Sequence, residues 1–175
     1  MIELVGKKVV LRALERAHCR RLWDDYEPEH PATESLNPGH SIEGADKWFE
    51  EIQSVQGKTQ VYLGIFSLDG ALIGDIQLAN IDWRNRSASV GMSITKRENR
   101  GGGYGTDAVM VLVKYAYEDL DLVRLSARTL VHNTAARRVL ENTGFILEGQ
   151  EREVVTIAGR RYDRLTFGLL RSDHA

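Results

Sequence analysis

The chain has 175 residues, of which 42% are hydrophobic and 27% charged, close to the globular average, so disordered, collagen-like and coiled-coil classes are excluded. Its 23 basic and 25 acidic residues give a net charge of −2, which lacks the basic surplus typical of nucleic-acid binding. No apolar run approaches the roughly 18 residues of a membrane helix, and the single cysteine, Cys19, cannot form an internal disulfide. We therefore expect one soluble, cytoplasmic domain over residues 1–175 that binds neither nucleic acid nor membrane.

The first third of the chain predicts a strand, two helices and a long loop. Val9 to Leu14 is short and β-branched, which indicates a strand, and residues 15–27 carry apolar side chains at helical spacing. Residues 28–40 contain all three prolines, so no helix runs through them. A loop of that length in a small domain favours a functional role. A second helix is expected from Ser41 to about Gly57.

The remaining two thirds predict a sheet interrupted by two helices. Strands over 61–67 and 71–78 are joined by Asp69-Gly70, a strong hairpin signal. The next elements are expected in the order strand 86–95, helix 106–118, strand 123–129, helix 133–142 and strands 145–157 and 161–170. This order predicts a mixed α+β domain on one central sheet of about seven strands.

The most informative segment is Arg-Glu-Asn-Arg-Gly-Gly-Gly-Tyr-Gly-Thr-Asp over residues 97–107, between a predicted strand and a predicted helix. Its glycines leave backbone N–H groups free to point at one target, and a helix N-terminus attracts anions. A flexible connector with solvated basic residues is the alternative. No lysine follows Gly105, as a Walker loop requires, and the loop comes too late in the chain for a Rossmann fingerprint.

Two motifs carry a resemblance to a known family. Arg100-x-x-Gly103-x-Gly105 resembles the Arg/Gln-x-x-Gly-x-Gly/Ala signature of the GNAT superfamily of acyl-CoA-dependent N-acyltransferases. Asn133 to Phe145 resembles the family's Asn-x-x-(Ser/Ala)-x-x-x-(Tyr/Leu)-x-x-x-Gly-Phe segment. The segments 10–14 and 73–78 are similar to the branch that acetylates the N-termini of ribosomal proteins. The resemblance spans nearly the whole chain and implies a mostly antiparallel sheet that splays between its fourth and fifth strands.

The resemblance also implies acetyl-CoA as co-substrate and a set of residues that bind it. Backbone amides of the glycine loop would hold the pyrophosphate, with positive charge from the arginine that opens the motif, namely Arg100, Gly101, Gly102, Gly103, Tyr104, Gly105 and Thr106. The preceding strand would pair with the pantetheine arm through Met92, Ser93, Ile94 and Thr95. One N–H between Met92 and Ile94 would polarise the thioester carbonyl.

Three polar residues of the second motif have both a structural and a functional interpretation. Asn133 stands where a strand gives way to a helix, so it is expected as a helix N-cap, as a hydrogen-bond donor to the cofactor arm or the incoming amine, or as both. Arg137 and Arg138 could reach a cofactor phosphate, and Arg138 is the cofactor-binding candidate, whereas adjacent arginines on a helix are commonly just exposed.

The catalytic groups are harder to assign. Acetyl transfer requires a neutral amine, so a general base is expected. The family's usual glutamate and tyrosine correspond to Ser89 and Leu140, and a further family serine corresponds to Ala136, so the usual groups are absent. Asp75 is the leading candidate base and a candidate for acceptor binding, because strand alternation can turn it to an open face; a solvated or structural role is the alternative. The other carboxylates and the imidazole considered are Glu29, which is also an acceptor-binding candidate, Glu34, Asp82 and His30.

Two functions remain open on the sequence. The first is direct transfer of acetyl from acetyl-CoA to a primary amine within a ternary complex, the amine belonging to a protein N-terminus or to a small molecule. The second is a non-catalytic acyl-CoA-binding or regulatory module. Cys19 lies in a predicted helix without a histidine partner, so we do not expect it to be a nucleophile. The resemblance makes a homodimer possible, no metal is expected, and Trp23, Trp48 and Tyr26 belong either to the core or to the acceptor pocket.

Overall fold

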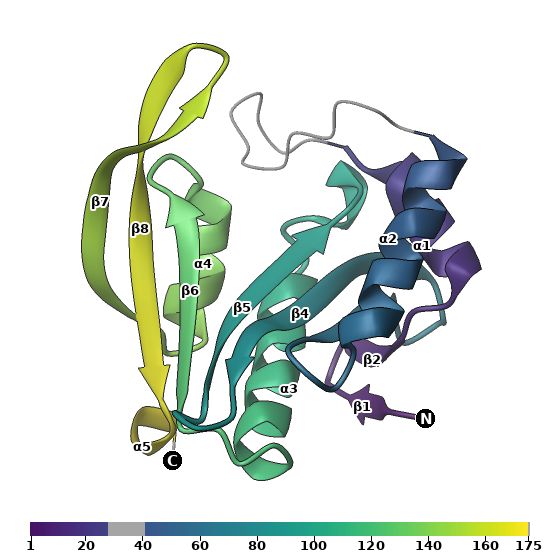
Figure 1. Cartoon of the computed structure of the whole chain (residues 1–175), viewed down its shortest axis with the longest axis horizontal. Coiled ribbons are helices and arrows are strands. Elements are labelled where there is room, and N and C mark those ends of the chain that lie inside the picture. Colours follow the sequence, from purple (N-terminus) through teal and green to yellow (C-terminus); the bar gives the residue numbers. More distant parts are fainter. Residues whose placement is uncertain (28–40, 175) are drawn as a thin grey trace.

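An eight-stranded sheet runs through the computed structural model, which describes residues 1–27 and 41–174 (Figure 1). Its spatial order is β1-β2-β3-β4-β5-β6-β8-β7, and every neighbouring pair is antiparallel except β5 and β6. The strands are β1 (Glu3–Val5), β2 (Val9–Ala13), β3 (Val61–Ser67), β4 (Leu72–Asp82), β5 (Ser87–Ile94), β6 (Arg124–Leu130), β7 (Ile146–Ile157) and β8 (Arg160–Leu170). This confirms the mixed α+β class. The strand missing from the sequence prediction is β1, whose three residues are too few to show a periodic pattern.

The helices cover both faces of the sheet. They are α1 (Arg16–Asp25), α2 (Ile42–Val55), the 3₁₀ turn η1 (Arg97–Asn99), α3 (Tyr104–Glu118), α4 (Thr134–Asn142) and a final turn, α5 (Arg171–His174). Figure 1 shows α3 behind the centre of the sheet, and α1 and α2 together at its other side. The four expected helices are therefore confirmed, with ends shifted by no more than two residues. The proline-rich segment, with Glu29, His30 and Glu34, lies outside the described residues.

Strand alternation sends apolar and polar side chains of the central strands to opposite faces. Ile76 and Leu78 of β4 are fully buried in the main core, together with Leu112 of α3. Asp75 and Gln77, which alternate with these two residues along β4, point to the other face, where α1 and α2 pack. A polar floor on that face is thus a direct consequence of the period of two in β4.

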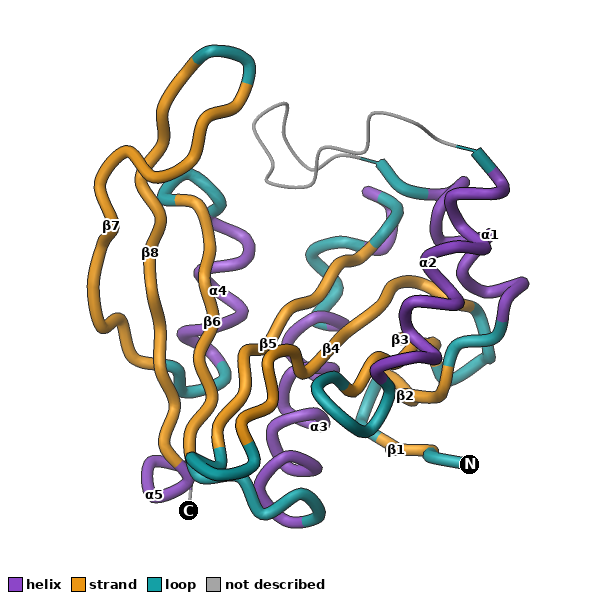
Figure 2. Tube along the Cα trace, viewed as in Figure 1, coloured by secondary structure: helices purple, strands orange, loops and turns teal. Residues whose placement is uncertain are grey.

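The two central parallel strands separate after a short contact. The backbone pairing of β5 with β6 covers only Ser87–Ser89 and Arg124–Ser126. Beyond that point Figure 2 shows the two strands diverging toward the end of β5 that leads into α3. This is the splay expected between the fourth and fifth predicted strands, and it opens a gap in the middle of the sheet.

In the part of the chain that the structure describes, no helix is long and apolar enough to cross a membrane.

Candidate active site

The glycine loop turns the chain from β5 into α3. Gly101 and Gly103 have φ angles of 78° and 83°, in the left-handed region that glycine adopts without strain. Gly103 is the N-cap of α3 and offers no side-chain cap, so the first N–H groups of this helix keep their hydrogen-bonding capacity. Asp107, one turn into the helix, anchors it by accepting hydrogen bonds from the backbone of Lys8 at 2.7 Å and of Val9 at 3.0 Å. The result is a firmly held helix start with exposed donors, suited to an anion.

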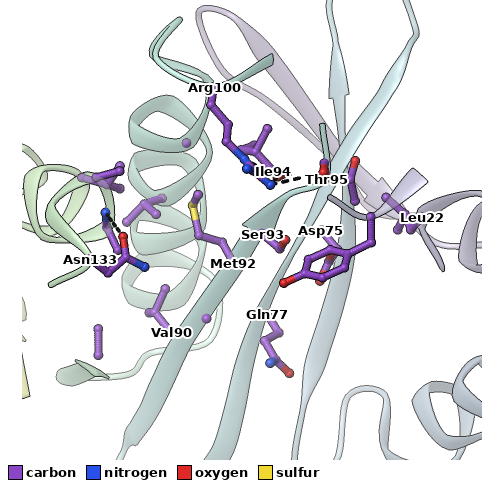
Figure 3. Close-up of a pocket in the computed structure, with 18 of the residues that line it drawn as sticks. Leu22, Asp75, Gln77, Val90, Met92, Ser93, Ile94, Thr95, Arg100 and Asn133 are labelled. Carbon is purple, nitrogen blue, oxygen red and sulfur yellow. Dashed lines mark hydrogen bonds between the residues drawn. The ribbon is translucent and has the colours of Figure 1, made fainter. Parts of the chain in front are cut away.

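Arg100 braces this loop against the end of β5. Its guanidinium donates to the carbonyl of Ile94 at 2.9 and 3.0 Å and to that of Thr95 at 3.2 Å (Figure 3). It also donates to the carbonyl of Glu27, whose own N–H donates to Thr95 at 2.8 Å. The sequence suggested Arg100 as a source of positive charge for phosphate, whereas its donors here join the loop, β5 and the chain leaving α1.

A cavity of about 590 Å³ occupies the splay and continues between β4, β5 and the two N-terminal helices (Figure 3). One side is formed by β5, the glycine loop and the start of α4, the other by aromatic residues over the polar floor. The residues that line this cavity include Trp23, Tyr26, Trp48, Tyr62, Asp75, Gln77, Val90, Gly91, Met92, Ser93, Arg100, Gly101, Gly105, Arg128, Asn133 and Leu140.

The register of β4 and β5 shows which backbone groups face the gap. Thr95 donates its N–H to Ile73 at 3.1 Å, so this pair and every second pair after it is hydrogen bonded within the sheet. The intervening residues Val90, Met92 and Ile94 therefore direct their N–H and C=O groups away from β4, toward the splay. The Ile94 carbonyl already accepts from Arg100, and the pairing of Ser89 with Ser126 uses the Val90 N–H, which leaves the Val90 carbonyl and Met92 as the open edge. This narrows the range expected from the sequence, Met92 to Ile94, to Met92 as the N–H donor nearest the loop.

The Asp75 side chain lies on the face of β4 that α1 and α2 cover, opposite the main core. It pairs with Ser93 across β4 and β5, is half-buried, and accepts a hydrogen bond from the Tyr62 hydroxyl at 2.8 Å. Burial raises the pKa of Asp75 to about 6, while the bond from Tyr62 lowers it in part. Burial and the adjacent carboxylate raise the pKa of Tyr62 as well, so its hydroxyl stays protonated and remains a donor. Asp75 is thus a carboxylate that takes up a proton near neutral pH inside a cavity.

Aromatic side chains form the wall above Asp75. Trp48 stands edge-on to Tyr62 with ring centroids 5.6 Å apart, and Trp23 lies 6.0 Å from Trp48. Both tryptophans and Tyr26 line the cavity, so the acceptor-pocket interpretation of these residues has structural support. Cys19 is fully buried beneath them, and burial, with the charge of Asp75, raises the pKa of its thiol to about 12. A protonated, inaccessible thiol is a poor nucleophile.

The residues around the start of α4 divide between structure and cavity. The Asn133 side chain accepts a hydrogen bond from Ala136 N–H at 3.1 Å, which confirms the N-cap, and the same residue lines the cavity. Arg137 pairs with Glu141 at 2.7 Å along the helix. Arg138 is exposed and does not line the cavity.

Two expected catalytic positions hold no acid or base. Leu140 is a buried apolar residue of the cavity wall. Ser89 sits at the closed base of the splay, where its hydroxyl contacts that of Ser126 at 3.2 Å. Asp82, the last residue of β4, accepts hydrogen bonds from Asn85 and lies away from the cavity. Among the described candidates for the base, the structure therefore brings Asp75 alone into the cavity.

Sequence analysis missed three cavity residues. Tyr62, Gln77 and Arg128 come from β3, β4 and β6, and each lies on the face shared with Asp75. Alternation counted from Asp75 would have found Gln77. Tyr62 and Arg128 require the cross-strand register, which the sequence of one strand does not carry.

This fold, with a splayed sheet and an open strand edge beside an uncapped, glycine-rich helix start, is that of an N-acetyltransferase. The chain belongs to the GNAT acetyltransferase family: the family model described as "Acetyltransferase (GNAT) domain" matches residues 8–146. The match includes the glycine loop and the whole second motif, Asn133 to Phe145.

Individual relatives agree with this assignment. The chain is 38% identical over 105 residues to a putative ribosomal N-acetyltransferase, YdaF, of Bacillus subtilis, covering 60% of this chain and 57% of that relative. It is 35% identical to a probable N-acetyltransferase, YjcK, of the same organism, over 77% of this chain and 75% of the relative. Among solved structures, spermidine N-acetyltransferase from Vibrio cholerae with CoA and spermine superposes with a TM-score of 0.84 at 23% identity, covering 95% and 97% of the two chains. At that identity the superposition supports the fold alone.

Proposed function

We propose that this chain transfers an acetyl group from acetyl-CoA to a primary amine by direct attack within a ternary complex, with Asp75 as the general base. The observation that carries the proposal is the placement of Asp75, a carboxylate with a pKa near neutrality, in one cavity with the open edge of β5 and the glycine loop. A module that only binds an acyl-CoA has no need for such a carboxylate.

The donor half of the cavity suits acetyl-CoA in three respects. The exposed amides at the start of α3 would hold the pyrophosphate, and the free edge at the Val90 carbonyl and Met92 would pair with the amide groups of the pantetheine arm. Gly105 is buried, and a Cβ there would come within 2.7 Å of the Met92 side chain, so glycine keeps the helix close to β5. The Met92 N–H would then donate to the thioester oxygen as negative charge develops on it.

The acceptor half supplies the proton transfer. The amine nitrogen forms a bond to the acetyl carbon and loses a proton to Asp75, and the bond from that carbon to the CoA sulfur breaks. The neutral amine is the attacking species, because an ammonium, whose pKa is near that of lysine at about 10, has no lone pair; it loses its first proton to solvent, since a base of pKa about 6 deprotonates it poorly in the ground state. As the nitrogen–carbon bond forms, the N–H becomes strongly acidic and Asp75 becomes a competent acceptor. The thiolate leaves without a dedicated side-chain acid, since Leu140 fills that position.

The test is a thiol-release assay with acetyl-CoA and a panel of primary amines, run beside mass spectrometry of the products. Acetylated amine formed in equal amount to free CoA is the expected result. Tight acetyl-CoA binding without release of CoA in the presence of any amine would instead support the binding-module alternative. Acetyl found on the protein would contradict direct transfer.

A further inference from the structure

The acceptor side of the cavity carries opposite charges on its two edges. The strand register places Tyr62, Gln77 and Gly91 in one row across β3, β4 and β5. The pairing of β5 with β6 ends at Ser89 and Ser126, and two residues further along each strand Gly91 and Arg128 lie on either side of the splay. All of these side chains are on the face of Asp75. Arg128 thus faces the carboxylate edge from the far side of the splay.

Between the two charges this floor carries the side chains of Gln77 and Ser93, both of which line the cavity. Gly91 has no side chain, and the Gln77 amide nitrogen lies 3.2 Å from the position a Cβ of Gly91 would take. Two strand spacings, about 10 Å before the splay widens them, separate the backbone of β4 from that of β6. Asp75 is in the next row, on the same strand as Gln77, so an acceptor that spans from β4 to β6 meets the Asp75 carboxylate and the Gln77 amide on β4 and the guanidinium of Arg128 on β6.

Arg128 is exposed to the cavity and makes no hydrogen bond or ion pair within the part of the chain that the structure describes. Its charge helps to lower the pKa of Glu151, but Glu151 is already paired with Arg164 at 2.9 Å. The other arginine of the cavity, Arg100, has its donors on backbone carbonyls. Arg128 is consequently the cavity cation that remains available to a ligand.

We propose that the acceptor is a small primary amine that also carries an anionic group, a carboxylate or a phosphate, several bonds from the nitrogen. This rests on the proposed function: Asp75 receives the amine end at the thioester, and Arg128 pairs with the anionic end. A polyamine fits this arrangement poorly, because its second cation would approach Arg128, and Asp75 is the single carboxylate that lines the described part of the cavity.

Matched acceptors isolate the anionic group. In the wild type, kcat/KM for γ-aminobutyrate should exceed that for n-butylamine by about tenfold to a hundredfold, the range expected for a charge-assisted contact. Aminopropylphosphonate against propylamine tests phosphate in the same way. Arg128→Gln should lower kcat/KM for the anionic amines more than for the plain amines and so remove the preference, whereas Arg128→Lys should retain part of it. Arg84→Gln is the control, because Arg84 is an exposed arginine of the β4–β5 turn that lines neither the active-site cavity nor the surface pocket beside the glycine loop.

Calorimetry gives a readout that needs no turnover. With CoA present, γ-aminobutyrate should bind the wild type more tightly than n-butylamine, and Arg128→Gln should abolish the difference. Equal binding and equal turnover of the paired acceptors, or a preference that survives Arg128→Gln, would overturn the inference while leaving amine acetylation intact. If no amine releases CoA, the proposed function fails, and the binding difference still decides whether Arg128 recognises an anion. Preference for spermidine over γ-aminobutyrate would also overturn it.

Discussion

Asp75→Asn should make the protein more stable and less active at the same time. In the folded chain the pKa of Asp75 is raised from 3.8 to about 6, a change of about 2 units. At 1.36 kcal/mol per unit, keeping this carboxylate ionised in the fold costs about 3 kcal/mol at neutral pH. Asparagine has the same shape, accepts the same bond from Tyr62, and carries no charge to desolvate.

The size of this stability difference depends on pH, and it changes within a defined window. Between about pH 4 and pH 6 the unfolded chain has released the Asp75 proton while the folded chain still holds it. The folded state therefore binds more protons there, and the contribution of Asp75 to the free energy of unfolding falls as the pH rises. Below pH 4 the wild type and Asp75→Asn should be equally stable. At pH 7 and above the free energy of unfolding of the variant should exceed that of the wild type by about 3 kcal/mol, or roughly 5–10 °C in Tm for a chain of this size.

Urea unfolding of both proteins across this pH range measures the difference directly. Asp82→Asn is the matched control, because bonds from Asn85 lower the pKa of Asp82 and give the opposite sign. That variant should be no more stable than the wild type at neutral pH and should keep its activity. A wild type and Asp75→Asn variant with parallel stability profiles would refute the burial argument.

The kinetic half of the same prediction separates two roles. If Asp75 is the base, kcat of Asp75→Asn should fall by about a hundredfold or more, and the acid limb of the wild-type profile near pH 6 should vanish. The deficit should shrink as the pH approaches the pKa of the acceptor itself. If Asp75 only positions the amine, the acceptor KM should rise with kcat little changed. An unchanged kcat would refute its role as base.

Two further substitutions test the donor site, and a third tests the buried thiol. Gly103→Val should weaken acetyl-CoA binding at least tenfold by calorimetry, since a side chain at φ 83° is strained and projects beside the free amides, whereas Gly159→Val, strained alike at φ 76° but in the β7–β8 turn, should not. Cys19→Ala should keep near-normal turnover, because the buried thiol stays protonated; lost activity in a folded variant would favour a covalent intermediate. Arg100→Ala should weaken acetyl-CoA binding equally at low and high salt, because its donors hold backbone carbonyls; a loss confined to low salt would indicate a direct phosphate contact.

The sequence could predict those parts of the site that depend on one continuous segment of the chain. The glycine loop and the Asn133 cap depend on local backbone preferences, and Asp75 faces the cavity because of alternation along a single strand. The position of Arg100 at the glycine loop was predicted correctly. The groups that its guanidinium binds were not, because a long side chain can reach several partners. The pairing of Tyr62 with Asp75 depends on the β3–β4 register, which includes a shift between Ile65 and Phe66.

The proposed position of the base, Asp75, would allow the site to work without the usual glutamate. Ser89, where that glutamate would stand, lies at the last paired position of β5 and β6, where the splay is closed. Asp75 is on the neighbouring strand and level with Ser93, near the open end of β5 and the glycine loop. The donor contacts come from backbone groups fixed by the fold, so the proton acceptor can move from one strand to the next as long as it faces the same gap. Its raised pKa follows from being buried there, which makes the instability of Asp75 and its use as a base two consequences of one position.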